Sequence, residues 1–299
     1  MNIYSQIAAN KRKTWLIMFL FVVFITTILF VYGKASGYGL SYAGIGLVFA
    51  GIMALVSYFY SDKMILGISS AKQIQKKDNP LLFRTVENLC IGAGIPMPKI
   101  YIIEDSAINA FSTGRDVNHA VVCVTTGCLE RLNKIELEGV IAHELSHIRN
   151  YDIRLMAIVV ILVGLIALLG DFFMRSLWFG GVKREKSDRD NTQGLFLILG
   201  IIFAILSPII ATLIQLAISR KREYLADASG ALLTRYPEGL ASALEKIEKD
   251  TEPLNVANNA TAHLYIANPF KGKINGSWFS HLFDTHPPIE ERIKILRSM

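Results

Sequence analysis

Four long apolar runs divide the chain, and amphipathic stretches lie between and after them. The first run covers residues 14–32 without an ionisable group, and the second covers residues 40–60 and is richer in glycine. A helix of about 20 apolar residues can cross the hydrocarbon core of a bilayer. Residues 1–60 are therefore predicted to form a transmembrane hairpin. A signal peptide is the alternative for the first run, but this run is longer than the apolar part of most signal peptides.

The other two runs, residues 155–173 and 194–218, predict a second transmembrane hairpin. Lysine and arginine residues next to membrane spans concentrate on the cytoplasmic side. The basic residues before the first run and at 220–222 agree on one side, whereas the polar loop 175–191 would then carry its basic residues outside. This second pair of segments is expected either to span the bilayer or to be only partly inserted.

The amphipathic segments, residues 61–154 and 219–299, predict the two parts of one soluble α+β unit. Apolar residues recur at helical spacing in some stretches, and β-rich residues bounded by turn residues mark others. Helices are expected at residues 80–90, from about residue 134, and at residues 236–249 and 288–296, and strands at residues 99–104 and 120–125. The predicted fold class is an α+β, polytopic α-helical membrane protein with up to four spans.

Composition supports a bilayer environment. Apolar residues make up 52% of the chain, charged residues 19%, and the mean hydropathy is +0.38. The net charge of +6 points to anionic lipid, because the basic residues gather at the edges of apolar runs and do not interleave with aromatic residues. No nucleic-acid partner is expected. The 3 cysteines form no CxxC pair, which indicates a reducing compartment for the soluble part.

Two histidines and a glutamate lie in one segment with helical periodicity: His143, Glu144 and His147. Residues i and i+4 of a helix share a face, so both imidazoles can reach one ion while the glutamate points to its open side. This HExxH arrangement is typical of zinc hydrolases, in which zinc lowers the pKa of a bound water and the carboxylate takes the proton. A chance match with ordinary surface histidines is the alternative, and a third ligand is needed to decide.

Glu223 and Asp227 are the candidates for completing such a site, since they too lie four residues apart. Glu223 can bind the metal, and Asp227 can accept the ring N–H of a ligand histidine and fix its tautomer. The alternative is an exposed helix whose acids pair with neighbouring arginines. The second predicted hairpin would return the chain to the membrane face at which His147 lies, which favours the metal site.

The combined motifs resemble those of one known family. HELSH and EYLAD, with Asn-Ala-Phe upstream and Thr-His-Pro-Pro downstream, are similar to the motifs of HtpX-type membrane metallopeptidases, gluzincins related to the prenyl-protein CAAX protease. The resemblance implies a gluzincin-like peptidase domain at the membrane face with one Zn²⁺ per chain. It also implies that His143, His147 and Glu223 bind the zinc, that Glu144 is the base, and that Asp227 supports a ligand.

Two further groups carry the resemblance. Asn109, Ala110 and Phe111 resemble the edge strand along which gluzincins align the substrate backbone. A turn-forming asparagine before an ordinary strand is the alternative. His286 and Arg292 resemble a pair that relatives place near the scissile carbonyl, where a fixed donor offsets the negative charge on the reacting oxygen. The alternative is a C-terminal helix after two prolines, with Arg292 in solvent.

The implied function is endoproteolysis of damaged or misassembled membrane proteins by an enzyme of the cytoplasmic membrane whose catalytic domain faces the cytoplasm. Membrane lipid and protein substrates would be its partners. Maturation of lipidated proteins is a rival function, although the prenyl proteases carry more spans. A zinc-stabilised scaffold has no use for Glu144, and a metal transporter needs ionisable residues in mid-membrane, which these runs lack. The remaining histidines, at 119, 263 and 281, are expected at the surface.

Overall fold

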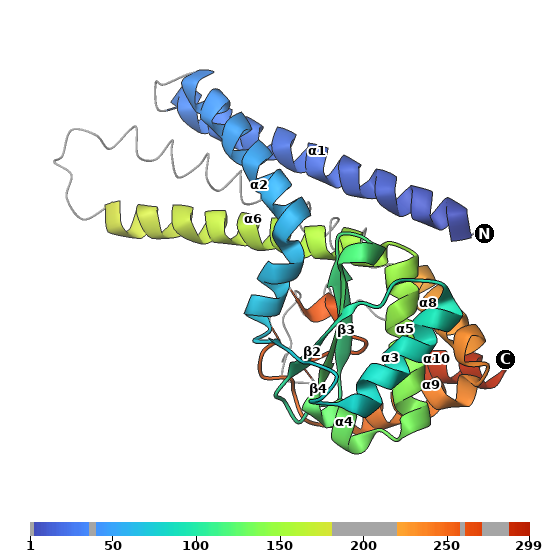
Figure 1. Cartoon of the computed structure of the whole chain (residues 1–299). Coiled ribbons are helices and arrows are strands. Elements are labelled where there is room, and N and C mark those ends of the chain that lie inside the picture. The colour runs from blue at the N-terminus through green and yellow to red at the C-terminus, as the bar shows by residue number, and fades with distance from the viewer. Residues whose placement is uncertain (1–2, 36–39, 181–219, 258–260, 271–286) are drawn as a thin grey trace.

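Two long helices begin the chain in the computed structural model, which describes residues 3–35, 40–180, 220–257, 261–270 and 287–299. α1 spans Ile3–Ala35 and α2 spans Leu40–Ile68. They lie side by side and project from the rest of the molecule (Figure 1). Both are long and apolar enough to cross a membrane. These candidate spans coincide with the predicted first hairpin, and each helix is longer than the apolar run that predicted it.

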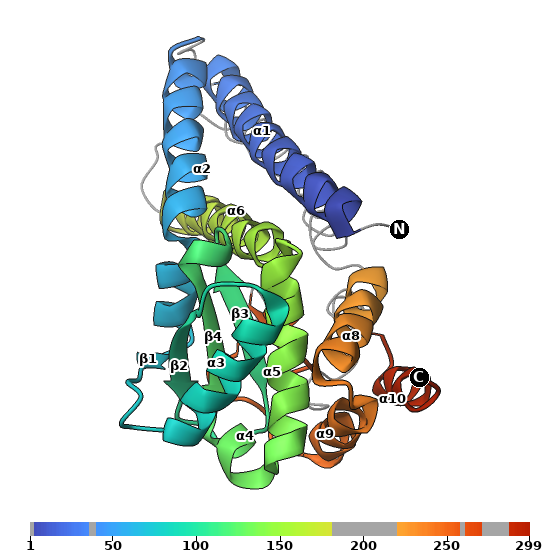
Figure 2. The ribbon, with the colours of Figure 1, turned by 45° about the vertical axis from the view of Figure 1, so that its right-hand side comes forward.

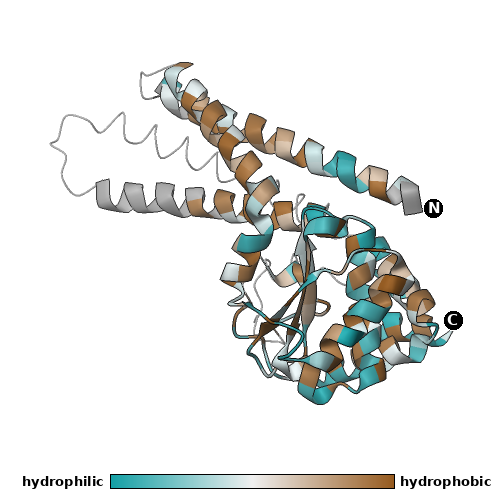
Figure 3. Cartoon of the chain, viewed as in Figure 1, coloured by the Kyte–Doolittle hydropathy of each residue, from teal (hydrophilic) through white to brown (hydrophobic). Residues whose placement is uncertain are grey.

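Apolar residues follow one another along much of both helices of this hairpin, as Figure 3 shows, and many of them are exposed. Trp15 and Phe19 of α1 and Val48 of α2 are among its exposed large side chains. Such side chains are unfavourable in water and favourable in lipid. A Cβ atom on Gly46 of α2 would lie 3.1 Å from Cβ of Leu29 in α1, so this glycine lets the two helices approach closely.

The third apolar run forms α6, which spans Asp152–Gly180 and packs against both helices of the hairpin. Leu155 of α6 lies in one apolar cluster with Ile17 of α1 and Ala54 of α2. The helix continues beyond its predicted end at residue 173, because no proline interrupts this part of the sequence. The predicted fourth run lies outside the described residues. Of the four predicted spans, the described residues therefore support two as candidates.

A mixed sheet of 4 strands lies next to these helices. Its strands are β1 (Lys72–Gln73), β2 (Lys99–Ile103), β3 (Ala110–Gly114) and β4 (Ala120–Thr125). The strand order is β1-β2-β4-β3, with β2 and β4 parallel and the other pairs antiparallel. The strands predicted at 99–104 and 120–125 are confirmed as β2 and β4. β3 forms one edge of the sheet.

The other helices complete an α+β unit. They are α3 (Pro80–Ala93), α4 (Thr126–Arg131), α5 (Lys134–Arg149), α8 (Arg220–Thr234), α9 (Pro237–Lys249) and α10 (Ile289–Arg297), with short 3-10 turns η1 (Val117–His119) and η2 (Ala262–Leu264). Figure 2 shows α5 between the sheet on one side and α8 and α9 on the other. The four helices predicted in the amphipathic segments are confirmed as α3, α5, α9 and α10.

Strands β3 and β4 are buried throughout, and their alternate side chains point to opposite sides of the sheet. Val122 of β4 lies in a core cluster with Leu82 of α3 and Ile141 of α5. Its neighbour Val121 lies in a different cluster, with Val160 of α6. Helix α6 is therefore part of the core of the unit that contains the sheet. Because α6 also packs against α1 and α2, direct packing holds this unit beside the candidate membrane helices.

Candidate metal centre

Helix α5 carries the HExxH segment through the middle of the molecule. Its N-terminus has a capping box, in which the side chains of Asn133 and Glu136 each accept a main-chain N–H of the other residue. From Leu137 to Ile148 almost every residue is buried. His143, Glu144 and His147 therefore lie in the interior, and the alternative of ordinary surface histidines is wrong for this pair.

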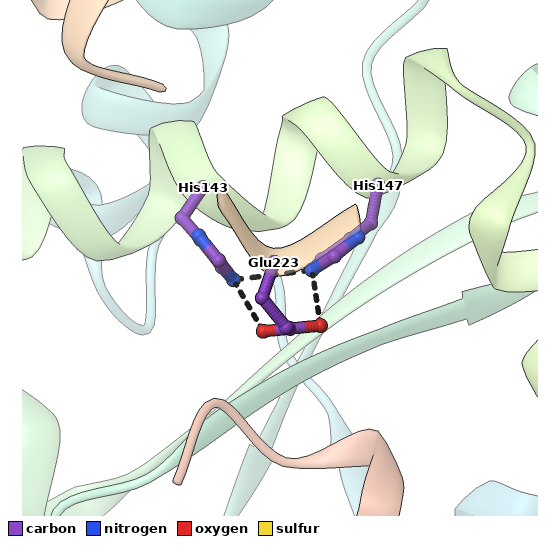
Figure 4. A group of neighbouring side chains, drawn as sticks. All are labelled: His143, His147 and Glu223. Carbon is purple, nitrogen blue, oxygen red and sulfur yellow. Dashed lines mark hydrogen bonds and ion pairs between the residues drawn. The ribbon is translucent and has the colours of Figure 1, made fainter. Parts of the chain in front are cut away.

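The metal-binding atoms of three side chains converge between α5 and α8. Nε2 of His143 lies 3.1 Å from Nε2 of His147. The carboxylate of Glu223 lies below both rings, with Oε2 3.7 Å from Nε2 of His143 and Oε1 3.8 Å from Nε2 of His147 (Figure 4). All three ligand atoms lie within 4.8 Å of one another. The structure thus brings together the three predicted ligands.

Close packing of α8 on α5 produces this arrangement. A Cβ atom on Gly230 would lie 3.0 Å from the main-chain nitrogen of His143, so only glycine fits there without a shift. Glu223 and Asp227 lie two turns and one turn before Gly230 on the same helix, so they share the face that packs against α5. The alternative of an exposed α8 whose acids pair with solvent-facing arginines is therefore wrong.

The outer nitrogen of each histidine contacts a carboxylate. Nδ1 of His143 lies 2.9 Å from Oδ1 of Asp227, as the sequence predicted, and Nδ1 of His147 lies 3.1 Å from Oδ2 of Asp152. A proton on each Nδ1 leaves the Nε2 lone pairs of the two rings facing each other. Two facing lone pairs repel unless a cation or a proton lies between them. Two imidazole nitrogens and one carboxylate form a donor set that fits zinc.

The surroundings of these rings are rich in negative charge. Burial acts to lower the pKa of His147, but the hydrogen bond with Asp152 and the charge of Glu223 outweigh it and raise this pKa to about 9. Burial likewise acts to raise the pKa of Asp227, but the charge and hydrogen bonds of Arg292 outweigh it and lower this pKa to about 2. The raised pKa of His147 and the lowered pKa of Asp227 both indicate surroundings that favour positive charge between the rings, which a bound cation would supply.

Arg292 lies behind Asp227 and is completely buried. Its Nε and Nη2 donate to the two carboxylate oxygens of Asp227 at 2.8 and 2.7 Å, and Nη1 donates to the main-chain oxygen of Ile266 at 3.0 Å. Nη1 also lies 4.0 Å from Oε2 of Glu223, so the guanidinium is next to the three converging side chains, and the expected role beside a scissile carbonyl stays a prediction. The alternative of a solvated Arg292 is wrong. The other member of the predicted pair, His286, lies outside the described residues.

Glu144 is not a member of the group of three converging side chains. Its Oε2 accepts a hydrogen bond of 2.7 Å from Oγ of Ser112 in β3, and it is 1% exposed. This arrangement fits a carboxylate that moves protons without binding the metal. Ser112 was not predicted, because its contact with Glu144 depends on how β3 packs against α5.

The predicted substrate strand is partly covered. Asn109 precedes β3, and its Nδ2 donates to the main-chain oxygen of Ala267 at 3.2 Å. The oxygen of Ala110 accepts a bond of 3.0 Å from the main-chain nitrogen of Ile266, and the ring of Phe111 packs edge-on against Tyr265 at 5.3 Å. All three predicted residues are therefore engaged within the chain.

The remainder of this edge makes fewer main-chain bonds. Among the described residues no other main-chain bond reaches the outer side of β3 from Ser112 to Gly114, although the side chains of Ser112 and Thr113 are buried. The segment that covers Ala110 also contains His263, which is buried in η2. The expectation that His263 lies at the surface is wrong, because its loop folds against β3. His281 lies outside the described residues.

Comparison with known proteins identifies the family. Residues 76–299 match Peptidase family M48. The chain belongs to peptidase family M48. It is a metalloprotease, as the HExxH pattern predicted, and the resemblance to HtpX-type enzymes is confirmed by its relatives. A "Protease HtpX homolog" of Dictyoglomus thermophilum is 49% identical over 298 residues, covering 99% of this chain and 94% of the relative.

Two further matches have different coverage. A "Protease HtpX homolog" of Lactobacillus helveticus is 48% identical over 306 residues, covering 99% of this chain and 100% of the relative. The crystal structure of S. mikatae Ste24p aligns with a TM-score of 0.48 at 18% identity, covering 95% of this chain. This chain spans only 66% of that longer protein.

Proposed function

We propose that this M48 metalloprotease is a zinc-dependent membrane endopeptidase in which His143, His147 and Glu223 bind one Zn²⁺. The observation that supports it most directly is the convergence of two buried Nε2 atoms, 3.1 Å apart, on one carboxylate. Zinc bound there would polarise water and the carbonyl group of a peptide bond. This proposal extends the family's chemistry to named residues of the chain.

Glu144 is the proposed proton carrier. Its carboxylate accepts a proton from the attacking water and then donates it to the leaving amine. The hydrogen bond from Ser112 fixes the carboxylate on the side of β3, where a substrate backbone would lie. Asp227 and Asp152 position the rings of the two histidines through their Nδ1 atoms.

The substrate is proposed to bind as an extended peptide along the outer edge of β3 between Ser112 and Gly114, where no main-chain bond is made among the described residues. Main-chain hydrogen bonds at a sheet edge bind peptides with little dependence on their sequence. This location differs from the predicted one at Asn109, Ala110 and Phe111, since residues 261–267 cover that end. His286 stays a prediction for the group that stabilises the carbonyl oxygen.

Damaged or misassembled membrane proteins are the proposed substrates, at the cytoplasmic face of the cell membrane, with lipid as the surrounding partner. The apolar surface of α1 and α2 supports membrane insertion, and His147 lies near the start of α6, which packs against both helices. The basic residues before the first apolar run favour a cytoplasmic N-terminus. Labelling of a cysteine placed at exposed Lys76 in intact cells tests this, because labelling from outside would contradict it.

Glu144→Gln tests the assignment of roles. We expect detergent-purified, zinc-loaded enzyme to cleave unfolded casein, and the variant to lose at least about a hundredfold in kcat while binding zinc as the wild type does. Proteolysis is followed by the release of soluble peptides, and zinc by atomic absorption. Loss of zinc from this variant, or retention of full activity, would contradict the proposal. Arg297→Ala, an exposed change on α10, serves as the control.

A further inference from the structure

The candidate membrane helix α1 reaches the metal centre through one side chain. Nδ2 of Asn10 donates to the main-chain oxygen of Asn150 at 3.0 Å and to Oδ1 of Asp152 at 2.7 Å. These partners lie 140 and 142 residues away in the sequence. Asn10 is 2% exposed, so the contact is shielded from water. An amide that would disfavour membrane insertion is thus satisfied by the peptidase unit.

Asp152 connects this contact to a predicted zinc ligand. While Oδ1 accepts from Asn10, Oδ2 lies 3.1 Å from Nδ1 of His147. The carboxylate stands in the first turn of α6, where the helix dipole favours negative charge, and the Nε atom of Arg222 lies 3.7 Å from Oδ1. Asp152 is therefore oriented from two sides, and one of these contacts comes from the membrane hairpin.

The turn between α5 and α6 is also contacted by α1. α5 ends at Arg149, and Tyr151 then adopts a φ of 59°, a left-handed conformation that bulky residues rarely adopt. Nζ of Lys11 lies 4.4 Å from the centre of the Tyr151 ring. Asn10 and Lys11 thus contact the turn at its main chain and at its side chain. Such a conformation persists where the surrounding structure fixes it.

We propose that α1 is a positioning element of the metal centre: Asn10 orients the carboxylate of Asp152, which in turn fixes the ring of His147 toward the metal. This inference rests on the proposed zinc site. Seating of the first membrane helix and formation of a tight metal site are then coupled. A chain whose α1 is displaced keeps His147 but loses the constraint on its ring. The competing view is that Asn10 only anchors α1, without effect on the metal.

A double-mutant cycle on the full-length protein in detergent distinguishes these views. The variants are Asn10→Ala, Asp152→Asn and the double variant, and the readouts are the rate of zinc loss to a chelator and the visible spectrum of the Co²⁺-loaded protein. We expect zinc affinity to fall roughly ten- to a hundredfold in Asp152→Asn and by about three- to tenfold in Asn10→Ala. Because Asn10 acts through Asp152, the double variant should lose no more than Asp152→Asn alone.

Thr14→Val is the matched control, because Thr14 is a buried polar residue one turn further along α1 whose hydroxyl donates to the main-chain oxygen of Asn10. It should leave zinc loss and the Co²⁺ spectrum unchanged. Asn10→Leu keeps a similar volume but removes the donor without adding a charge, and it decides the matter should Asn10→Ala fail to fold. Wild-type zinc retention in the folded Asn10 variants, or additive losses in the double variant, would overturn the inference.

The proposed function fails in a different way. If the wild type binds zinc no better than His147→Ala does, the metal site itself is wrongly assigned. If the wild type binds zinc through His147 but the Asn10 variants match it, the metal site stands and only the role of α1 is refuted.

Discussion

The two histidines of the metal centre are supported by different parts of the molecule. Asp227, the partner of His143, makes two charged hydrogen bonds with Arg292 of the C-terminal helix α10. Asp152, the partner of His147, accepts from the neutral amide of Asn10 in a candidate membrane helix. The Nε atom of Arg222 lies further from this carboxylate, at 3.7 Å. One carboxylate is thus fixed by a buried ion pair within the α+β unit, and the other by the junction with the membrane helices.

This difference separates two functions of the scaffold. A bidentate arginine fixes a carboxylate firmly, and its geometry depends only on the packing of α8 and α10. An asparagine on a candidate membrane helix that packs against the rest of the chain on one side only should respond to how that helix is seated. We expect the orientation of the His143 ring to be independent of the membrane, and the orientation of the His147 ring to depend on how α1 is seated in it. The following predictions test this contrast.

Removal of Glu223 should have the largest effect, because this residue lies between the two sides and contacts both rings. Glu223→Ala is expected to lose zinc and all proteolysis, since catalytic zinc needs three protein ligands. Zinc content after gel filtration measures this directly. A Glu223→Ala protein with full zinc affinity would mean that another group is the third ligand.

Removal of Arg292 should lower the free energy of unfolding and also weaken the support of the His143 ring by Asp227. Arg292→Ala leaves Asp227 buried without its ion-pair partner, which costs about 3–5 kcal/mol of unfolding free energy when one member of a buried pair is removed. Zinc affinity should fall with it, in contrast to the expectation for a donor that contacts only the reacting carbonyl. Thermal unfolding with and without zinc measures both effects.

Arg297→Ala on the same helix is the control for Arg292→Ala. Its guanidinium pairs with Glu238 and Glu245 at the surface, where such pairs contribute roughly 0–1 kcal/mol. A decrease in kcat for Arg292→Ala with unchanged stability and zinc would restore the oxyanion role that the sequence suggested.

The sequence predicted those site residues whose geometry is local. His143 and His147, like Glu223 and Asp227, are four residues apart on helices, so their shared faces follow from helix geometry alone. Ser112, Asp152 and Asn10 could not be predicted in this way. Each meets its partner through tertiary packing, and a polar residue at the start of a helix or in an apolar run has many ordinary explanations.

The same reasoning applies to the fold. Periodicity predicted α3, α5, α9, α10, β2 and β4, and apolar length predicted the hairpin of α1 and α2. Neither pattern could predict that residues near Ile266 cover Ala110, because these residues are 156 positions apart in the sequence and their contact leaves no local pattern. The role of Arg292 likewise depends on its burial, which could not be predicted from the short polar helix in which it lies.

In the metal-free protein, the contacts of His147 and those of Asp227 should affect stability in different pH ranges. The folded pKa of His147, raised to about 9, lies above its unfolded value near 6.5, so its contribution to stability is complete below about pH 6.5 and is lost as the pH rises through 9. This contribution is on the order of 3 kcal/mol. Asp152→Asn should flatten this alkaline decline, and an unchanged profile would contradict the assigned pairing.

The Asp227 side should respond at the opposite end of the scale. Its folded pKa, lowered to about 2, lies below an unfolded value near 3.9, so its contribution is present above about pH 4 and is lost as the pH falls toward 2. A shift of this size corresponds to about 2.6 kcal/mol. Chelator-treated protein is unfolded thermally from about pH 2 to about pH 10, and Asp227→Asn should lower the stability above about pH 4 and flatten the acid limb.

The smallest expected effect concerns Tyr151, at the turn where α1 contacts the His147 side. Its positive φ favours glycine, whereas its ring contacts Lys11 and Arg154 at 4.4 and 5.0 Å. Tyr151→Ala loses the ring and keeps the unfavourable backbone conformation, while Tyr151→Gly loses the ring and relieves it. Glycine should therefore be more stable than alanine by about 1 kcal/mol, measured by thermal unfolding. Equal stabilities would show that the turn relaxes when the ring is removed. Zinc loss should then accelerate in both variants, because Asp152 directly follows Tyr151 and would lose its fixed position.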